Sequence, residues 1–182
     1  VDGTTGFLIT ASMDEGPILA QSTTEIGLHG NAGDLLSRLA VDGSKLLVSA
    51  LQAMSEGQIQ PVEQERGSYE IAQKIRVDDA HMRFDVPVFA LDRQIRACTP
   101  NPGAWCRVHG FTGRNDEDTG VMLHVLRAEP APDGDAAPQG LAPGVLHVAK
   151  NAVWVGTSTD PLQILEVKAE GKRAMPAADW AR

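Results

Sequence analysis

The sequence has few of the features that mark secreted, membrane-bound or metal-binding proteins. Its two cysteines, Cys98 and Cys106, lack the paired spacing of a zinc site and are too few for a disulfide framework. No run of about 18 apolar residues occurs, and Val1 is followed by Asp2 rather than by a basic segment and an apolar stretch. We therefore expect a soluble, cytoplasmic protein with no membrane span and with both thiols reduced.

Positive charge is also scarce. The 16 Lys and Arg residues stand against 24 Asp and Glu, a formal net charge of −8, which argues against a protein that binds nucleic acid regardless of sequence. The deficit is uneven along the chain. Up to Glu70 there are three basic and ten acidic residues, a balance of −7, whereas from Ile71 onward there are thirteen and fourteen, a balance of −1. The second part can therefore still present a basic face to RNA.

The motifs of several common chemistries are missing. The sequence contains neither a glycine-rich phosphate-binding loop nor a Gly-x-Ser-x-Gly nucleophile elbow. No histidine has a partner at the spacing of a metal site such as His-Glu-x-x-His, so we expect no bound metal. The five histidines are His29, His81, His109, His124 and His147.

The first part of the chain predicts a strand, a loop, a strand and a long helix. A β-prone run over residues 7–10 is interrupted by the turn-forming residues 13–17 before an apolar run resumes at Ile18. Leucines then recur at helical spacing, with Asn31 as the expected N-cap, Asp34 three residues later and Gly57 as the stop. Within this helix, Gly43 is expected to mark a close contact with the sheet.

The second part predicts a short helix followed by a small barrel. The helix is expected over residues 87–98, with Asp85 as a possible cap and Pro87 in its first turn. Five short β-prone segments separated by turns follow, and residues 129–143 form a long loop between the second and the third. The five segments are residues 105–109, 121–128, 145–149, 152–156 and 162–167. A short helix is expected at 176–182.

Asp14 is the residue that most invites a chemical role. On its own it fits an ordinary turn, because Asp followed by Glu-Gly is common turn chemistry. Its context, however, resembles the folate-dependent formyltransferases, in which a Thr-Gly, an apolar strand and a Leu/Met-Asp-x-Gly loop bring an aspartate to the active site. Here Thr5-Gly6 precedes the apolar run, and Met13-Asp14-Glu15-Gly16 forms the loop.

Four further stretches are similar to methionyl-tRNA formyltransferases in particular. Residues 34–47 look like the helix after that loop, and residues 69–75 look like the segment after the interdomain linker. Arg93-Gln94-Ile95-Arg96-Ala97 with Pro100–Trp105 resembles the opening of their C-terminal domain, and residues 171–175 match their near-terminal motif. The matching stretches follow one another in the same order as in the family and extend over nearly the whole chain.

The resemblance implies an α/β fold in two parts. Residues 1–57 are expected to be the C-terminal portion of a Rossmann-like formyltransferase domain. Residues 58–75 are expected to be a linker, and residues 76–182 an oligonucleotide-binding (OB)-like β-barrel that helps to hold tRNA. The implied reaction transfers the formyl group of 10-formyltetrahydrofolate to the α-amine of methionyl-initiator-tRNA, by a protein expected to be monomeric.

The same resemblance assigns residues to roles. Asp14 is the expected catalytic residue, and Ser12 and Met13 with Asp14 are the expected wall for the pterin ring of the folate. The residues expected to contact tRNA phosphates are Lys74, Arg76, Arg93, Arg96, Lys172 and Arg173.

The sequence departs from the family at two points. The family's catalytic asparagine and histidine precede the Thr-Gly and have no counterpart here, so we expect this chain to lack transferase activity on its own. The spacing between Gly6 and Met13 is about three residues short, a difference that would reverse the facing of a strand. Two alternatives stay open: a relative that acts on a sugar nucleotide or hydrolyses formyl-folate, and a non-catalytic RNA-binding barrel.

Overall fold

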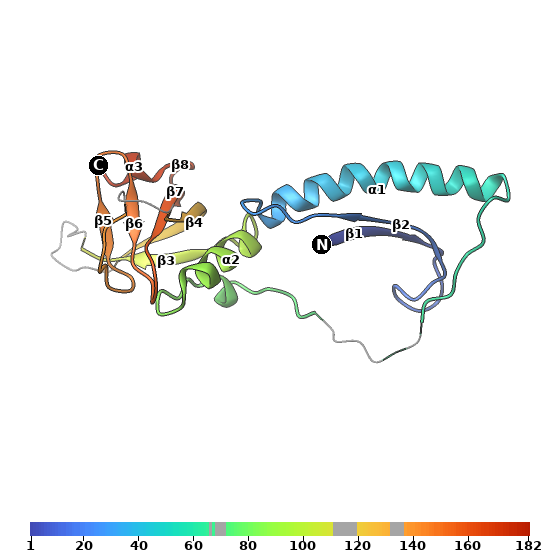
Figure 1. Cartoon of the computed structure of the whole chain (residues 1–182), viewed down its shortest axis with the longest axis horizontal. Coiled ribbons are helices and arrows are strands. Elements are labelled where there is room, and N and C mark those ends of the chain that lie inside the picture. The colour runs from blue at the N-terminus through green and yellow to red at the C-terminus, as the bar shows by residue number, and fades with distance from the viewer. Residues whose placement is uncertain (66, 68–71, 111–119, 132–136) are drawn as a thin grey trace. The chain divides into compact units, whose positions relative to one another are not determined.

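The protein forms two compact units, Val1–Gln73 and Lys74–Arg182. The computed structural model describes the 182-residue chain except for residues 66, 68–71, 111–119 and 132–136. Figure 1 shows the elements of each unit.

The first unit is a β-hairpin and one long helix. Strands β1 (Asp2–Phe7) and β2 (Ile18–Thr24) pair antiparallel, with a register shift between Gly6 and Phe7. Helix α1 spans Ala32–Ser55. The side chain of Asn31 accepts a hydrogen bond from the backbone N–H of Asp34, and the Asp34 carboxylate accepts one from the N–H of Asn31. This confirms the expected capping box.

Helix α1 lies along the hairpin, as Figure 1 shows. At Gly43 the two come close, because a Cβ added there would lie 3.2 Å from the Cγ2 of Thr4 on β1. The side of α1 that is at least partly buried includes Leu39, Gly43, Leu46 and Ala50, which follow one another at helical spacing. The expected contact between helix and sheet at Gly43 is thus present.

Part of the stretch predicted as a linker belongs structurally to the first unit. Val62 and Ile18 exchange backbone hydrogen bonds of 2.9 and 2.7 Å, so residues near Val62 extend the edge of the hairpin at β2. The linker was inferred from polar, aperiodic composition, and composition does not reveal a single bridging pair.

The second unit contains the remaining elements. A 3₁₀ turn, η1 (Asp78–Ala80), is followed by helix α2 (Val88–Cys98). The strands are β3 (Trp105–Val108), β4 (Val121–Pro130), β5 (Leu146–Val148), β6 (Val153–Val155), β7 (Leu162–Ala169) and β8 (Met175–Pro176). Helix α3 (Ala177–Trp180) comes last.

The strands of the second unit form one curled antiparallel sheet. Its order is β3-β4-β7-β6-β5, and β8 pairs with β7 beyond the end of β6. Register shifts in β4 between Val125 and Ala128 bend the sheet. The inward side chains pack with Leu91 and Ile95 of α2 into a continuous core, so α2 closes the curled sheet.

The predicted elements differ from the observed ones in four places. The first strand, expected from the β-prone run over residues 7–10, spans Asp2–Phe7 instead, and residues 8–10 are not in a strand. The polar and glycine-containing residues 2–6 form the strand because they pair with β2, which local β-propensity does not reveal.

Asp85 does not cap α2, because Pro87 occupies the N-cap and the backbone N–H of Val88 donates instead to Thr159 Oγ1 at 3.1 Å. Strand β4 runs two residues into the predicted loop of residues 129–143, of which residues 132–136 lie outside the described part. The two-residue strand β8 was not predicted, because two residues carry no periodicity.

Candidate functional site

Asp14 lies at the tip of the β1–β2 hairpin. The loop is closed where the backbone N–H of Leu8 donates to the carbonyl of Pro17 at 2.9 Å. Asp14 has a φ of 58°, a left-handed conformation that aspartate adopts more readily than most residues. Gly16 is buried against the other side of the loop, and a Cβ added to it would overlap the carbonyl oxygen of Leu8. The loop therefore needs glycine at this position.

A side chain from the predicted linker supports the loop. The Gln64 amide donates from Nε2 to the carbonyl oxygens of Asp14 at 3.0 Å and Gly16 at 2.7 Å. Gln64 thereby fixes the backbone on both sides of Glu15. Sequence reasoning missed this residue, because a glutamine in a polar stretch carries no signal of a contact 50 residues away.

The residues expected to bind folate share one open hollow at this tip. Its walls come from the loop itself, and its volume is about 460 Å³. Ser12, Met13 and Asp14 all line it and are all exposed. Ile9 is 94% exposed and Met13 is 87% exposed, so large apolar side chains stand in solvent beside the carboxylate. An apolar wall next to a carboxylate suits a flat ring with polar edges.

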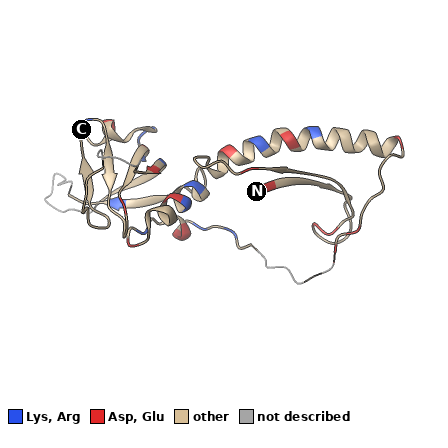
Figure 2. Cartoon of the chain, viewed as in Figure 1, with Lys and Arg blue, Asp and Glu red and all other residues tan. Residues whose placement is uncertain are grey.

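The cations expected to contact tRNA are not gathered at one place in the second unit. Lys74 and Arg76 precede η1, and the backbone N–H of Arg76 donates to Asp79 Oδ2 at 2.7 Å. Lys172 and Arg173 are exposed in the turn between β7 and β8. Basic and acidic residues are interspersed over the second unit (Figure 2).

The two arginines of α2 differ in availability. Arg93 is exposed, and its guanidinium lies 5.4 Å from the ring centre of Phe89. Arg96 pairs with Asp92 at 2.9 Å, and the two side chains are only 20% and 12% exposed. Because this carboxylate already compensates the charge of Arg96, Arg93 is the more accessible cation of the two.

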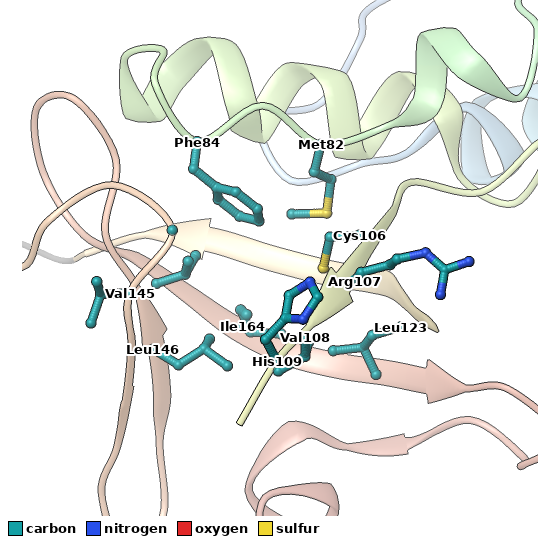
Figure 3. Close-up of a pocket in the computed structure, with 12 residues that line it drawn as sticks. Met82, Phe84, Cys106, Arg107, Val108, His109, Leu123, Val145, Leu146 and Ile164 are labelled. Atoms are coloured by element: carbon teal, nitrogen blue, oxygen red, sulfur yellow. The ribbon is translucent and has the colours of Figure 1, made fainter. Parts of the chain in front are cut away.

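A second cavity lies within the second unit (Figure 3). It has a volume of about 370 Å³, and its lining is mostly apolar, with Phe84 and Leu146 on either side and the sulfur atoms of Met82 and Cys106 facing it. Burial raises the pKa of the Cys106 thiol to about 11. At neutral pH this thiol is protonated and is a poor nucleophile. No carboxylate is among the described residues that line this cavity, whereas the Asp14 loop presents one.

Metal binding and membrane insertion depend on features of other parts of the chain. Over the described residues, no three His, Cys, Asp or Glu side chains cluster in a way that could hold a metal ion. In the same part of the chain, no helix is both long enough and apolar enough to cross a membrane.

The structure resembles solved structures that include a formyltransferase. It matches the crystal structure of HypX from Aquifex aeolicus in complex with tetrahydrofolic acid with a TM-score of 0.70 and 17% identity, covering 98% of this chain and 29% of that one. It matches an N-formyltransferase from Helicobacter canadensis with a TM-score of 0.57 and 17% identity, covering 89% and 54%. These likenesses confirm the expected fold class, with the end of a Rossmann-like domain followed by a barrel-like domain.

The sequence comparisons agree. A methionyl-tRNA formyltransferase of Bifidobacterium adolescentis is 62% identical over the whole chain, which covers 56% of that protein. One from Mycobacterium avium is 39% identical, again over the whole chain and 55% of that protein. The chain thus spans about half the length of the curated relatives it matches. Residues 74–182 match the family described as "Formyl transferase, C-terminal domain", and the chain belongs to that formyltransferase family.

Proposed function

We propose that this chain is the C-terminal part of an enzyme that transfers the formyl group of 10-formyltetrahydrofolate to the α-amine of methionyl-initiator-tRNA. The main support is the 62% identity over the whole chain to a protein named methionyl-tRNA formyltransferase. The folate donor is proposed from this relationship, and a relative in fold was crystallised with tetrahydrofolic acid. The chain alone is expected to be inactive, and the complete enzyme is expected to act as a monomer in the cytoplasm.

Asp14 is the proposed catalytic residue. In formyl transfer the amine attacks as the neutral base, the formyl oxygen becomes negative, and a proton leaves the nitrogen. A carboxylate serves the proton transfer. It accepts the proton that leaves the nitrogen, or it orients the group that accepts this proton. Asp14 is exposed at the tip of a loop whose backbone is held by Gln64, so its carboxylate is both accessible and positioned.

Ser12 and Met13 are proposed to form a wall for the pterin ring. Both line the hollow beside Asp14, and Met13 offers a flexible, polarisable side chain that packs well against a flat ring. The basic residues proposed to contact tRNA phosphates are Lys74, Arg76, Arg93, Lys172 and Arg173, with Arg96 restrained by its ion pair to Asp92.

The test is the substitution Asp14→Asn in a protein that extends this chain to the full length of its relatives. Formylation of methionyl-tRNA is expected to fall by about 100-fold or more in kcat, the range for loss of a group that handles protons. The KM for the folate is expected to change little, because Asn keeps the shape of the side chain. Normal formylation by the Asp14→Asn enzyme would show that Asp14 takes no part in the reaction.

Glu15→Gln is the matched control. Glu15 is the next residue, is exposed in the same loop, and loses the same charge on substitution. Its kcat is expected to stay within about twofold of the parent, since an exposed charge near a site has a small effect. An equal loss in both variants would show that the loop needs negative charge in general rather than Asp14.

The alternative substrate, an amino sugar on a nucleotide, is tested in the same assay. The Helicobacter canadensis structure contains dTDP-3-aminofucose, but at 17% identity it supports the shared fold alone. The curated relatives favour methionyl-tRNA. A preference of the extended protein for an amino sugar nucleotide over methionyl-tRNA would reverse this choice.

A further inference from the structure

The segment that follows helix α1 returns to the β1–β2 hairpin and reaches the Asp14 loop in a fixed register. Val62 exchanges backbone hydrogen bonds with Ile18, the first residue of β2. This bridge is antiparallel, so each step forward from Val62 is matched by one step backward from Ile18. Two steps bring Gln64 opposite Gly16, the place of the next hydrogen-bonded pair in a continued ladder.

At this place the side chain of Gln64 takes over the role of the backbone. Its Nε2 donates to the carbonyl oxygen of Gly16 at 2.7 Å and to that of Asp14 at 3.0 Å. The side-chain amide has two N–H donors, so one group can satisfy both carbonyls at once. A backbone N–H has one hydrogen and would hold only one of them. The side chain therefore secures more of the loop than a further ladder pair would.

The two carbonyls belong to residues with special backbone requirements. Asp14 has a φ of 58°, a left-handed conformation that costs a residue other than glycine free energy unless its surroundings hold it. Gly16 is packed against the carbonyl of Leu8, where a Cβ would not fit. In the stretch 61–65, Gln64 is partly buried and the other residues are exposed. The segment thus turns one side chain inward, at the point where the loop needs support.

The chemistry of glutamine suits a support beside a catalytic carboxylate. A lysine or arginine could donate to the same carbonyls, but its positive charge would also attract the Asp14 carboxylate toward the loop backbone. A glutamate of the same length would place its oxygen atoms against the carbonyl oxygens, acceptor against acceptor. A neutral amide holds the backbone and adds no charge next to the carboxylate.

We propose that Gln64 is a positioning residue for formyl transfer. By holding the carbonyls of Asp14 and Gly16, it selects the loop conformation in which the Asp14 carboxylate takes part in the reaction. Gln64 acts through Asp14 and not on the substrates. A displacement of about 1 Å at a catalytic group is enough to lower a rate about 100-fold. This inference rests on the proposed function, because it requires Asp14 to serve in the reaction.

The test substitutes Gln64 in the extended protein and measures kcat and the KM for methionyl-tRNA. Gln64→Glu keeps the length of the side chain but sets acceptors against acceptors, and its kcat is expected to fall about 10- to 100-fold. Gln64→Met has a similar length and no donor, and its kcat is expected to fall about 10-fold. The KM for methionyl-tRNA is expected to stay within about twofold, because the change affects the reaction and not binding.

Gln60→Glu is the matched control. It is the same substitution in the same segment, at an exposed residue on the other side of the Val62 bridge. Its kcat is expected to stay within about twofold of the parent, since an added exposed charge has a small effect. An equal loss in Gln60→Glu and Gln64→Glu would overturn the inference, because it would show that the segment is sensitive to any added negative charge.

A double-mutant cycle separates the positioning of Asp14 from general support of the fold. In an Asp14→Asn background, Gln64→Glu is expected to change kcat by less than about twofold, because no carboxylate is left to position. A structural role would lower kcat by the same factor in both backgrounds, and that result would overturn the inference. All assays are run well below the thermal unfolding midpoint of each variant. If Gln64→Glu does not fold, Gln64→Met takes its place in the cycle.

The failure of this inference can be told from the failure of the proposed function. A loss of activity in Asp14→Asn, together with parent-like kcat in both Gln64 variants, would remove the role of Gln64 and leave the proposed function standing. An extended protein that does not formylate methionyl-tRNA would overturn the proposed function, and the positioning role with it.

Discussion

The two units bury their apolar side chains to very different extents. Among the described residues, Ala50 is the buried hydrophobic residue of the first unit, and all the others belong to the second. The second unit has a core that joins α2, the curled sheet and α3. In the first unit, one side of α1 covers the hairpin while another exposes several large apolar side chains. These include Leu36 at 64%, Leu47 at 51% and Val48 at 66% exposed.

This difference shows which part of the chain can stabilise itself. A hairpin and one helix without a buried core cannot offset the conformational entropy lost on folding. An exposed apolar surface of this kind is typical of a surface that packs against other parts of a protein. The exposed leucines of α1 fit the proposal that the first unit completes a larger catalytic domain, whereas the second unit has the core of an independent domain.

The largest expected effect comes from separating the two units. A fragment of residues 74–182 is expected to unfold cooperatively on heating, because it retains the whole core. A fragment of residues 1–73 is expected to show no cooperative transition. Circular dichroism of both fragments measures this. All three tryptophans lie in the second unit, so tryptophan fluorescence of the intact chain provides the reference transition for that fragment. A cooperative transition in the shorter fragment would contradict the comparison.

A pair of leucines in helices provides a finer test. Leu91 of α2 is 0% exposed, and Leu36 of α1 is 64% exposed. Leu91→Ala is expected to lower the free energy of unfolding by about 2–5 kcal/mol, the usual cost of a cavity in a core. Leu36→Ala is expected to change it by less than about 0.5 kcal/mol. Urea unfolding of the intact chain, followed by tryptophan fluorescence and by circular dichroism, measures both. Equal losses would show that the apolar side of α1 is covered in solution.

The sequence predicted those elements of the fold whose signal comes from residues close together in the chain. Asn31 and Asp34 are three residues apart, and their reciprocal hydrogen bonds form wherever a helix begins between them. The main strands of the barrel were located because β-prone segments of several residues are separated by turn-forming residues. Asp14 was placed correctly between two strands for the same reason.

The sequence could not reveal features that depend on distant pairs. The Gln64 contact joins residues 50 apart, and nothing in a polar stretch distinguishes that glutamine from its neighbours. The pairing of Trp105 with His124 and of His124 with Lys168 depends on the registers of two strand pairings, so these residues look unrelated along the chain. Arg96 looked as available as Arg93, because only the packing of α2 shows which of them faces a buried Asp92.

The core of the second unit predicts a dependence of stability on alkaline pH. Burial raises the pKa of Cys106 from 9.0 to about 11. The folded state therefore holds the proton more tightly, and the stabilisation is complete below pH 9 and is lost as the pH rises through about 11. The loss is expected to reach roughly 3 kcal/mol at most. Urea unfolding between pH 8 and pH 11 measures it. In Cys106→Ala this component of the slope is expected to vanish, and an unchanged slope would show that other groups cause it.

The smallest expected effect concerns the start of α1, where the first unit has its best-defined local structure. Asn31→Ala removes an acceptor for the backbone N–H of Asp34 and is expected to cost about 1 kcal/mol of local stability. Asn31→Ser keeps an acceptor at the N-cap and is expected to stay close to the parent. Hydrogen exchange of the Asp34 amide measures the difference directly. Faster exchange in the Ala variant alone would show that α1 begins at Asn31 in solution, although its unit lacks a core. Equal exchange in the parent chain and in both variants would show that the first turn of α1 is frayed. The first unit would then lack a stable helix start as well as a buried core.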